Sequence, residues 1–120
     1  MPRFVVLQHE PGPKSARPLH WDLMLESGDI LRTWALESVP SVGQPIAAQL
    51  LEDHRQDYLE YEGPVSDGRG SVCRWDAGHF TWLDADGDAV TVELQGTRLN
   101  CSLQLTRETK EPHQWTACFT

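Results

Sequence analysis

His20 and Asp22 are the residues whose types and spacing most readily do chemistry. They lie two positions apart in Leu19–Glu26, a run that alternates in period two, and residues i and i+2 of a strand project from one face. An imidazole and a carboxylate placed side by side are natural ligands for a borderline divalent metal such as Mn²⁺ or Zn²⁺. His9 ends the preceding apolar run and could reach the same point from an adjacent strand. A hydrogen-bonded pair on the protein surface is the alternative interpretation of this spacing.

A second polar cluster, Glu52–His54, is followed by Tyr58. By composition this cluster is a polar loop or a strand end, where a histidine among acids usually lies in solvent. Arg69 and other arginines downstream could meet a phosphate, although basic side chains on turns are normally solvated. His79 and His113 have no partner pattern, and we expect both to be structural or exposed.

The charge balance narrows the class of protein. The chain has 18 acidic against 10 basic residues and a net charge of −8. Proteins that coat long nucleic acids are usually basic, so the balance argues against a non-specific DNA coat. An enzyme that grips one phosphate at a strand end stays possible, because a bound divalent metal supplies local positive charge. The sequence contains neither a P-loop nor a Gly-x-Ser-x-Gly elbow.

The length of 120 residues predicts a single domain, 1–120. No apolar run approaches the ~20 residues that a membrane span needs, and the N-terminus does not resemble a secretory signal. The three cysteines are an odd number without a Cys-x-x-Cys pair, which is typical of a reducing compartment. We therefore expect a cytoplasmic protein.

Short segments of period-two alternation, separated by Gly and Pro, dominate the chain. Ser27–Asp29 and Asp86–Gly87 are turn signals. One segment, Ile46–His54, has helical propensity, but it is short for an independent helix. Seven or eight short strands predict an all-β fold, a small closed or nearly closed antiparallel β-barrel with little helix. We expect strands at Phe4–His9, Leu19–Glu26, Ile30–Leu36, Ser71–Trp75, His79–Leu83, Ala89–Leu94, Leu99–Leu105 and Gln114–Phe119.

Taken in order, these pieces resemble the 3′-phosphoesterase domain found at the N-terminus of bacterial DNA ligase D. The likeness covers nearly the whole chain, and its specificity comes from the order of five motifs. The last part, Val90–Leu105 with Trp115, matches the closing strands of the family loosely. The motifs are Phe4–His9, Leu19–Glu26, Ile30–Ala35, Glu52–His54 with Tyr58 and Tyr61–Gly63, and Val72–Asp76.

The resemblance implies a compact β-barrel whose mouth holds one Mn²⁺, with Zn²⁺ or Co²⁺ as alternatives. It also implies removal of a 3′-terminal ribonucleotide or 3′-phosphate from a primer strand, which leaves a 3′-hydroxyl. The metal ligands of the family match His9, His20 and Asp22. The candidate catalytic residues, again by resemblance, are His54, Glu52 and Tyr58, and His54 is the one that contacts the phosphate.

The chain departs from the family pattern at three positions where the family carries a cation. These positions align with Met24, Ser38 and Ile46. The loop between the two metal-binding histidines is also longer here. Loss of one cationic contact commonly costs ~10²–10³ in rate. The candidate replacements are Lys14, Arg17 and Arg69, and the expected phosphate-binding set is His54, Arg17 and Arg69.

We therefore expect a metal-dependent 3′-phosphoesterase that trims DNA 3′ ends for repair. The alternative is a catalytically weak or inactive barrel that binds phosphorylated DNA ends, which the missing cations favour. A β-domain without any site is a third interpretation, and the ordered motif match argues against it. The expected partner is a DNA 3′ end, with a separate DNA ligase, polymerase or end-binding protein as further candidates and no membrane.

Overall fold

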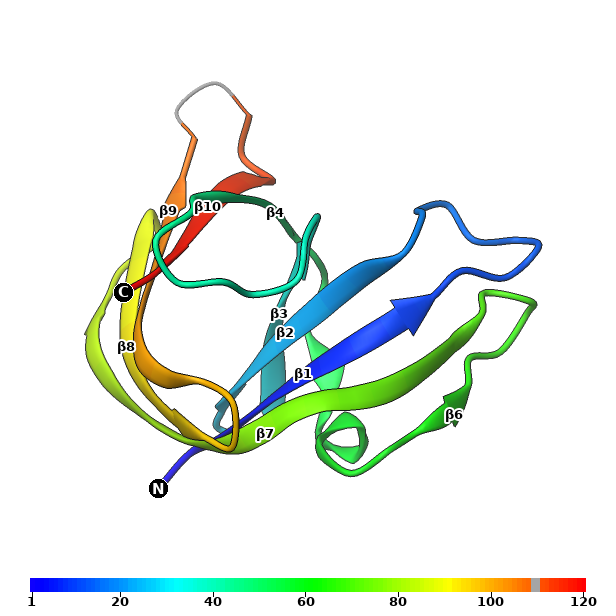
Figure 1. Ribbon diagram of the computed structural model, residues 1–120, viewed down its shortest axis with the longest axis horizontal. Coiled ribbons are helices and arrows are strands. Elements are labelled where there is room, and N and C mark those ends of the chain that lie inside the picture. Colours follow the sequence, from blue (N-terminus) through cyan, green and yellow to red (C-terminus); the bar gives the residue numbers. More distant parts are fainter. Residues whose placement is uncertain (109–110) are drawn as a thin grey trace.

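Eight strands of the chain form a closed antiparallel barrel, as the computed structural model shows for residues 1–108 and 111–120 (Figure 1). The strand order is β1-β2-β3-β4-β10-β9-β8-β7, and pairing of β7 with β1 closes the barrel. β6 extends the sheet beyond β7, and β5 pairs with β3. The elements are β1 (Arg3–Glu10), β2 (His20–Ser27), β3 (Ile30–Leu36), β4 (Ile46–Leu50), β5 (His54–Arg55), the 3₁₀ turn η1 (Gln56–Leu59), β6 (Gly63–Pro64), β7 (Ser71–Ala85), β8 (Ala89–Gly96), β9 (Asn100–Arg107) and β10 (Gln114–Phe119).

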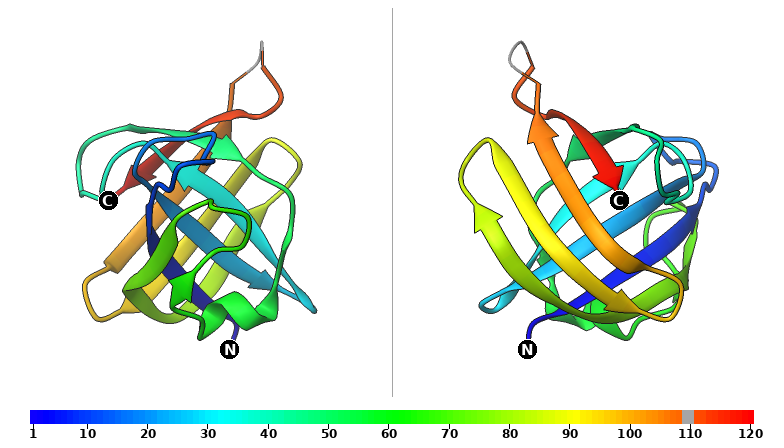
Figure 2. Two further views of the ribbon diagram at one scale, coloured as in Figure 1. Left: turned by 90° about the vertical axis from the view of Figure 1, so that its right-hand side faces the viewer. Right: turned by 60° about the vertical axis from the view of Figure 1, so that its left-hand side comes forward.

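The part of the sheet formed by β1, β2 and β3 buries both of its faces, each in a separate hydrophobic cluster. The inner face contributes Phe4, Leu23 and Trp34 to the core that fills the barrel. The outer face packs beneath β5, η1 and β6, a segment that lies outside the barrel wall (Figure 2). The outer cluster consists of Val5, Leu7, Met24, Leu31, Leu59 and Val72. Because both faces are covered, β2 does not divide into an apolar and a polar face as its alternation suggested.

The segments Ser71–Trp75 and His79–Leu83, expected as two strands, form one 15-residue strand, β7. Its first part pairs with β1 and its second part with β8, and Gly78 pairs with both neighbours at the switch. A Cβ at Gly78 would lie 2.1 Å from the backbone oxygen of Gln95. The prediction of a strand boundary was wrong because this glycine permits a close approach of strands rather than a turn.

The helical propensity of Ile46–His54 does not produce a helix. Its first five residues form β4, whose Ile46 and Ala48 side chains are buried in the barrel core. β4 is paired with β3 on one side and β10 on the other, and this pairing outweighs a local propensity difference. Within residues 1–108 and 111–120 the helical structure amounts to η1, and none of it is long and apolar enough to cross a membrane.

The buried carboxylate of Asp76 fixes the turn between β8 and β9. It accepts backbone hydrogen bonds from Thr97 (2.9 Å), Arg98 (3.2 Å) and Leu99 (2.8 Å). Asp76 is 3% exposed and its hydrogen bond with Leu99 is buried, so removal of the carboxylate leaves the Leu99 donor without a partner. No local pattern around Asp76 distinguishes this structural aspartate from the exposed ones.

We expect Asp76→Ala to lower the free energy of unfolding by about 3 kcal/mol, the scale of buried donors left without an acceptor. Urea denaturation measures this change. Asp84→Ala is the matched control, since Asp84 is exposed on the same strand and a surface substitution usually stays within about 0.5 kcal/mol. Equal stability of the two variants would contradict the assigned role.

Candidate metal centre

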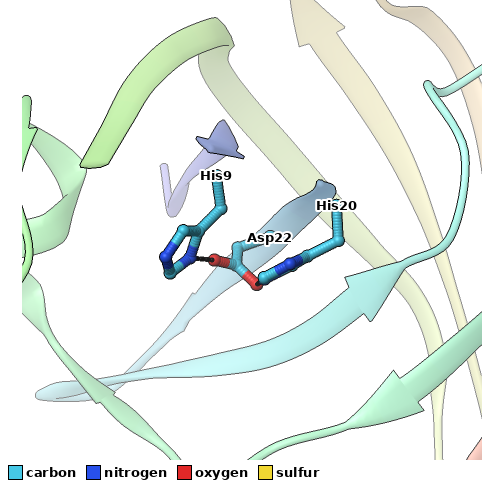
Figure 3. A group of neighbouring side chains, drawn as sticks. All are labelled: His9, His20 and Asp22. Atoms are coloured by element: carbon cyan, nitrogen blue, oxygen red, sulfur yellow. Dashed lines mark hydrogen bonds and ion pairs between the residues drawn. The ribbon is translucent and has the colours of Figure 1, made fainter. Parts of the chain in front are cut away.

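The strands β1 and β2 bring His9, His20 and Asp22 together. His9 is paired with His20 in the ladder, and Asp22 follows two positions later on the same face of β2. One ligand atom from each side chain lies within 4.8 Å of the others. Figure 3 shows the two imidazoles on either side of the carboxylate. The convergence predicted from the spacing and the resemblance is therefore present in the fold.

The trio lies on the outer face of the barrel wall, near the end of β1, and not on the face that lines the interior. Alternation along the strands decides this placement, because Leu7 and Met24 share the face of the trio and belong to the outer cluster. Leu23, on the opposite face, belongs to the barrel core. The mouth position implied by the resemblance is thus corrected to an outer surface beside the rim.

Backbone carbonyls fix which nitrogen of each imidazole carries a hydrogen. His20 Nδ1 donates to the Pro18 carbonyl at 3.0 Å, and His9 Nε2 donates to the Arg69 carbonyl at 2.8 Å. In the neutral rings the other nitrogens carry lone pairs, and both lie against Asp22: His20 Nε2 at 3.0 Å and His9 Nδ1 at 3.2 Å. Three acceptors therefore converge, and they need a proton or a cation between them.

The electrostatics of Asp22 fit a cation. Burial opposes ionisation of this carboxyl, but the contacts with His20 and His9 outweigh burial and lower its pKa from 3.8 to about 2. Its Oδ1 is buried without a hydrogen-bond partner in the described part of the chain, because the His20 contact lacks hydrogen-bond geometry. Two imidazoles oriented by carbonyls and a charged carboxylate are a donor set that suits a divalent transition metal.

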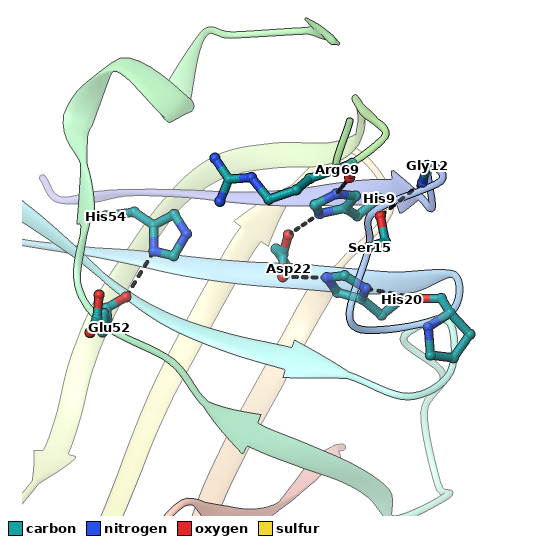
Figure 4. Close-up of polar contacts among 9 residues, drawn as sticks. His9, Gly12, Ser15, His20, Asp22, Glu52, His54 and Arg69 are labelled. Atoms are coloured by element: carbon teal, nitrogen blue, oxygen red, sulfur yellow. Dashed lines mark hydrogen bonds and ion pairs between the residues drawn. The ribbon is translucent and has the colours of Figure 1, made fainter. Parts of the chain in front are cut away.

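A cavity of about 390 Å³ opens over the trio. Its lining includes every other residue predicted for phosphate contact or catalysis except Tyr58. Figure 4 shows Glu52, His54 and Arg69 around the trio. The predicted residues that line it are His9, Arg17, His20, Asp22, Glu52, His54 and Arg69. Ser15, Ala16 and Leu51 also line the cavity, and sequence reasoning did not identify them.

His54 enters the cavity from the start of β5, which pairs with β3 at Leu31. Its Nδ1 donates to the Glu52 carbonyl at 2.8 Å, which leaves Nε2 as the nitrogen available to a ligand. Tyr58 lies outside the cavity, with its ring edge-on to His54 at a centroid distance of 5.5 Å. Tyr58 therefore supports the orientation of the His54 ring rather than facing the metal trio.

Arg69 contributes to the site through both its backbone and its side chain. Its carbonyl holds His9, while its guanidinium donates to the Ser66 carbonyl (2.9 Å) and hydroxyl (3.1 Å) and keeps further N–H groups free for an anion. The loop that carries it packs tightly on the loop after β1, since a Cβ at Gly70 would lie 1.8 Å from the Glu10 carbonyl oxygen. The glycines around Arg69, which we interpreted as punctuation, thus position a functional residue.

The three residues at the family cation positions contribute nothing to the cavity. Met24 is buried in the outer cluster and Ile46 in the barrel core. Ser38 is exposed in the loop after β3. Of the candidate replacements, Arg17 and Arg69 line the cavity, whereas Lys14 is not among its lining residues.

The fold and the site together define a small β-barrel whose outer wall carries two histidines and an aspartate placed as potential metal ligands beside a cavity. A family model described as the DNA Ligase D 3′-phosphoesterase domain matches residues 13–107. The chain belongs to this family. The match includes His20, Asp22, His54 and Arg69 and begins after His9.

Curated relatives agree with this assignment. The chain is 34% identical over 87 residues to the multifunctional non-homologous end joining protein LigD of Pseudomonas aeruginosa, an alignment that covers 68% of this chain and 10% of that protein. It is 30% identical over 113 residues to the multifunctional non-homologous end joining DNA repair protein LigD of Mycobacterium tuberculosis, covering 87% of this chain and 14% of that protein. The chain thus spans a small fraction of the length of these relatives.

The contact between His9 and Asp22 predicts how the stability of the metal-free protein depends on pH. The Asp22 carboxylate raises the pKa of His9 above 6.5, although partial burial opposes the shift. Protonated His9 therefore stabilises the fold fully below pH 6.5, and this contribution is lost as the pH rises through the raised pKa. Asp22, with a pKa of about 2, stays ionised throughout this window.

We expect the difference in Tm between the EDTA-treated wild type and His9→Gln to be larger near about pH 5.5 than near about pH 8.5. Thermal unfolding followed by circular dichroism measures this difference. His79→Gln, which changes an exposed histidine on β7, should show no such trend. A His9→Gln difference that is equal at both pH values would show that the pair is not coupled.

Proposed function

We propose that the protein is a Mn²⁺-dependent 3′-phosphoesterase that trims 3′-ribonucleotides or 3′-phosphates from DNA ends during end-joining repair. The observation that carries this proposal is a single cavity in which the metal-ligating trio adjoins His54, Arg17 and Arg69. Family membership supports the same class of reaction. Zn²⁺ and Co²⁺ suit two imidazoles and a carboxylate as well, so they are the alternative metals.

His9, His20 and Asp22 would hold the metal, which would supply Lewis-acid polarisation of a phosphate oxygen when bound. The chain itself orients both imidazoles through the Pro18 and Arg69 carbonyls, so that the ligand atoms are in place before metal binding. This preorganisation limits the rearrangement that binding requires.

Other side chains of the cavity neutralise the phosphate. Charge on the phosphoryl oxygens must be balanced as the reaction proceeds, and donors fixed around the cavity provide this balance. The Nδ1 of His54 already donates to the Glu52 carbonyl, so Nε2 is the nitrogen that faces the phosphate. The charged ring donates a hydrogen bond from Nε2 to a phosphate oxygen. The guanidinium groups of Arg17 and Arg69 line the same cavity and replace the missing family cations.

The decisive test is an assay on primer-templates that end in a 3′-phosphate or a 3′-ribonucleotide, with Mn²⁺ and with EDTA. We expect conversion to 3′-hydroxyl ends with Mn²⁺ and none with EDTA. Gel mobility and extension by a DNA polymerase identify the product. A wild type that is inactive with Mn²⁺, Zn²⁺ and Co²⁺ would contradict the assignment as an enzyme.

A second candidate function is recognition of a phosphorylated end without cleavage. The burial of Met24 and Ile46 favours it, because neither position can offer a cation to the cavity. In that case the metal-loaded protein binds 3′-phosphate duplexes more tightly than 3′-hydroxyl duplexes and does not hydrolyse them. Fluorescence anisotropy on the same primer-templates measures this preference.

The remaining parts of the proposal concern context. The proposed substrate is a DNA 3′ end, and a separate DNA ligase, polymerase or end-binding protein would use the trimmed end. We propose that this work takes place in the cytoplasm. Ligase and polymerase pull-downs with the full chain test the partners directly.

A further inference from the structure

A second cavity, of about 290 Å³, adjoins the metal cavity. The two share His20 and Arg17 in their linings, so a ligand held at the metal can continue past the His20 ring without leaving the surface. The cavity beside Tyr58 and Tyr61 shares no lining residue with the metal cavity. The cavity next to His20 is therefore a better place than the cavity beside Tyr58 for the group attached to a bound phosphate, and it adjoins a potential metal ligand, which a third cavity, lined by Gln49, Glu52 and His113, does not.

The outer face of three paired strands forms the floor of this second cavity. Asp22 on β2, Ala35 on β3 and Gln49 on β4 are consecutive partners across the sheet. Because Ala35 is small, it leaves a depression between the buried carboxylate and the exposed amide. The exposed side chains of Pro18 and Leu19 supply apolar surface to the lining.

The lining combines apolar surface from Pro18, Leu19 and Ala35 with polar side chains that can fix the orientation of a ligand. The Gln49 amide can both donate and accept hydrogen bonds, and the Glu37 carboxylate accepts them. Flat rings with polar edges satisfy such a lining, because their faces cover Pro18 and Leu19 while their edges meet the Gln49 amide. A nucleoside has this chemistry, and it is also the group joined to the phosphate at a strand end.

We propose that this cavity binds the terminal nucleoside of the strand whose phosphate lies in the metal cavity, with Gln49 as its polar anchor and Ala35 as its floor. The proposal rests on the proposed function for the identity of the phosphate. It predicts that a nucleoside attached to phosphate adds affinity, whereas phosphate alone leaves the second cavity unused.

The test is isothermal titration calorimetry of the Mn²⁺-loaded full chain with adenosine 5′-monophosphate and with inorganic phosphate. We expect the nucleotide to bind at least ~10-fold more tightly than phosphate. Gln49→Ala removes the amide, and Ala35→Leu fills the depression. Each variant should bind the nucleotide no more tightly than phosphate, while its affinity for phosphate stays unchanged. Gln104→Ala, at an exposed glutamine on β9, is the matched control.

Two further measurements make the outcome decisive. The Mn²⁺-induced rise in Tm must persist in both variants, which shows that Asp22 next to Ala35 still binds metal. His113→Ala examines a third cavity, which shares Gln49 and Arg17 but not Ala35. Loss of the nucleotide excess in His113→Ala, together with its survival in Ala35→Leu, would move the nucleoside to that third cavity and overturn the proposal.

Equal affinities of the wild type for nucleotide and phosphate, or no detectable nucleotide binding, would also overturn the proposal. This result differs from failure of the proposed function. A protein that binds the nucleotide more tightly but leaves primer-templates uncut retains the nucleoside cavity and loses the assignment as an enzyme. A protein that cuts primer-templates without the nucleotide excess retains the enzyme and loses the cavity.

Discussion

His54→Ala is expected to lower the Mn²⁺-dependent phosphoesterase rate by at least ~10², the scale of a lost transition-state donor. The reason is the geometry of the cavity: a phosphate held at the metal needs a donor on its other side, and His54 Nε2 is free to provide it. Met24 is buried among apolar side chains and offers no donor to the phosphate, so more of this stabilisation depends on His54. Single-turnover assays on a 3′-phosphate primer-template measure the rate.

His79→Ala and His113→Ala are the controls for this experiment, because both histidines are exposed and neither lines the metal cavity. All three variants should share the Tm of the wild type, since half-buried His54 belongs to neither hydrophobic cluster. If His54→Ala and the two controls react at one rate while the wild type is active, the chemistry lies elsewhere.

Asp22→Asn is expected to abolish metal binding and activity together. This substitution keeps the shape of the side chain but removes the charge that two imidazoles hold in place. Even residues that only orient a metal ligand change affinity by ~10–100-fold, so a lost carboxylate ligand should exceed that range. The Mn²⁺-induced rise in Tm, measured by thermal unfolding, should disappear in Asp22→Asn.

Asp84→Asn provides the matched control, since this carboxylate is exposed on β7, outside the metal cavity. It should keep both the Mn²⁺ shift and the activity of the wild type. A Mn²⁺ shift that survives in Asp22→Asn but disappears in Asp84→Asn would place the metal outside the β1–β2 ladder.

The strands of the barrel and the common face of His20 and Asp22 could be predicted because both depend on local alternation. The position of His9 at the end of the preceding apolar run indicated that it could reach the same point, but the register of β1 against β2, which brings it opposite His20, could not be read from local sequence. The position of His54 likewise depends on a two-residue strand that pairs far along the chain, with Leu31. Local composition carries no information about such pairing.

The remaining differences between expectation and structure have one common cause, which is long-range pairing. Ile46–Leu50 became a strand because two neighbours pair with it, and Gly78 continued a strand because β1 and β8 approach it closely. The alternation of β2 could not reveal that its polar face is half covered, since the covering segment lies some thirty residues later. Tyr58 belongs to a family motif, yet its ring contacts the His54 ring edge-on and does not line the metal cavity.

The placement of the metal trio on the outer wall has a consequence for how this chain can change over evolutionary time. The residues that hold the barrel closed and those that face the cavity project from opposite sides of the same strands. Substitution of a cavity residue therefore leaves the packing of the barrel core intact, and the fold also accommodates Met24 at a position where the family resemblance implies a cation. Substitutions in the cavity can therefore change or weaken the activity of such a protein, or restore it with arginines from nearby loops, while the barrel fold stays the same.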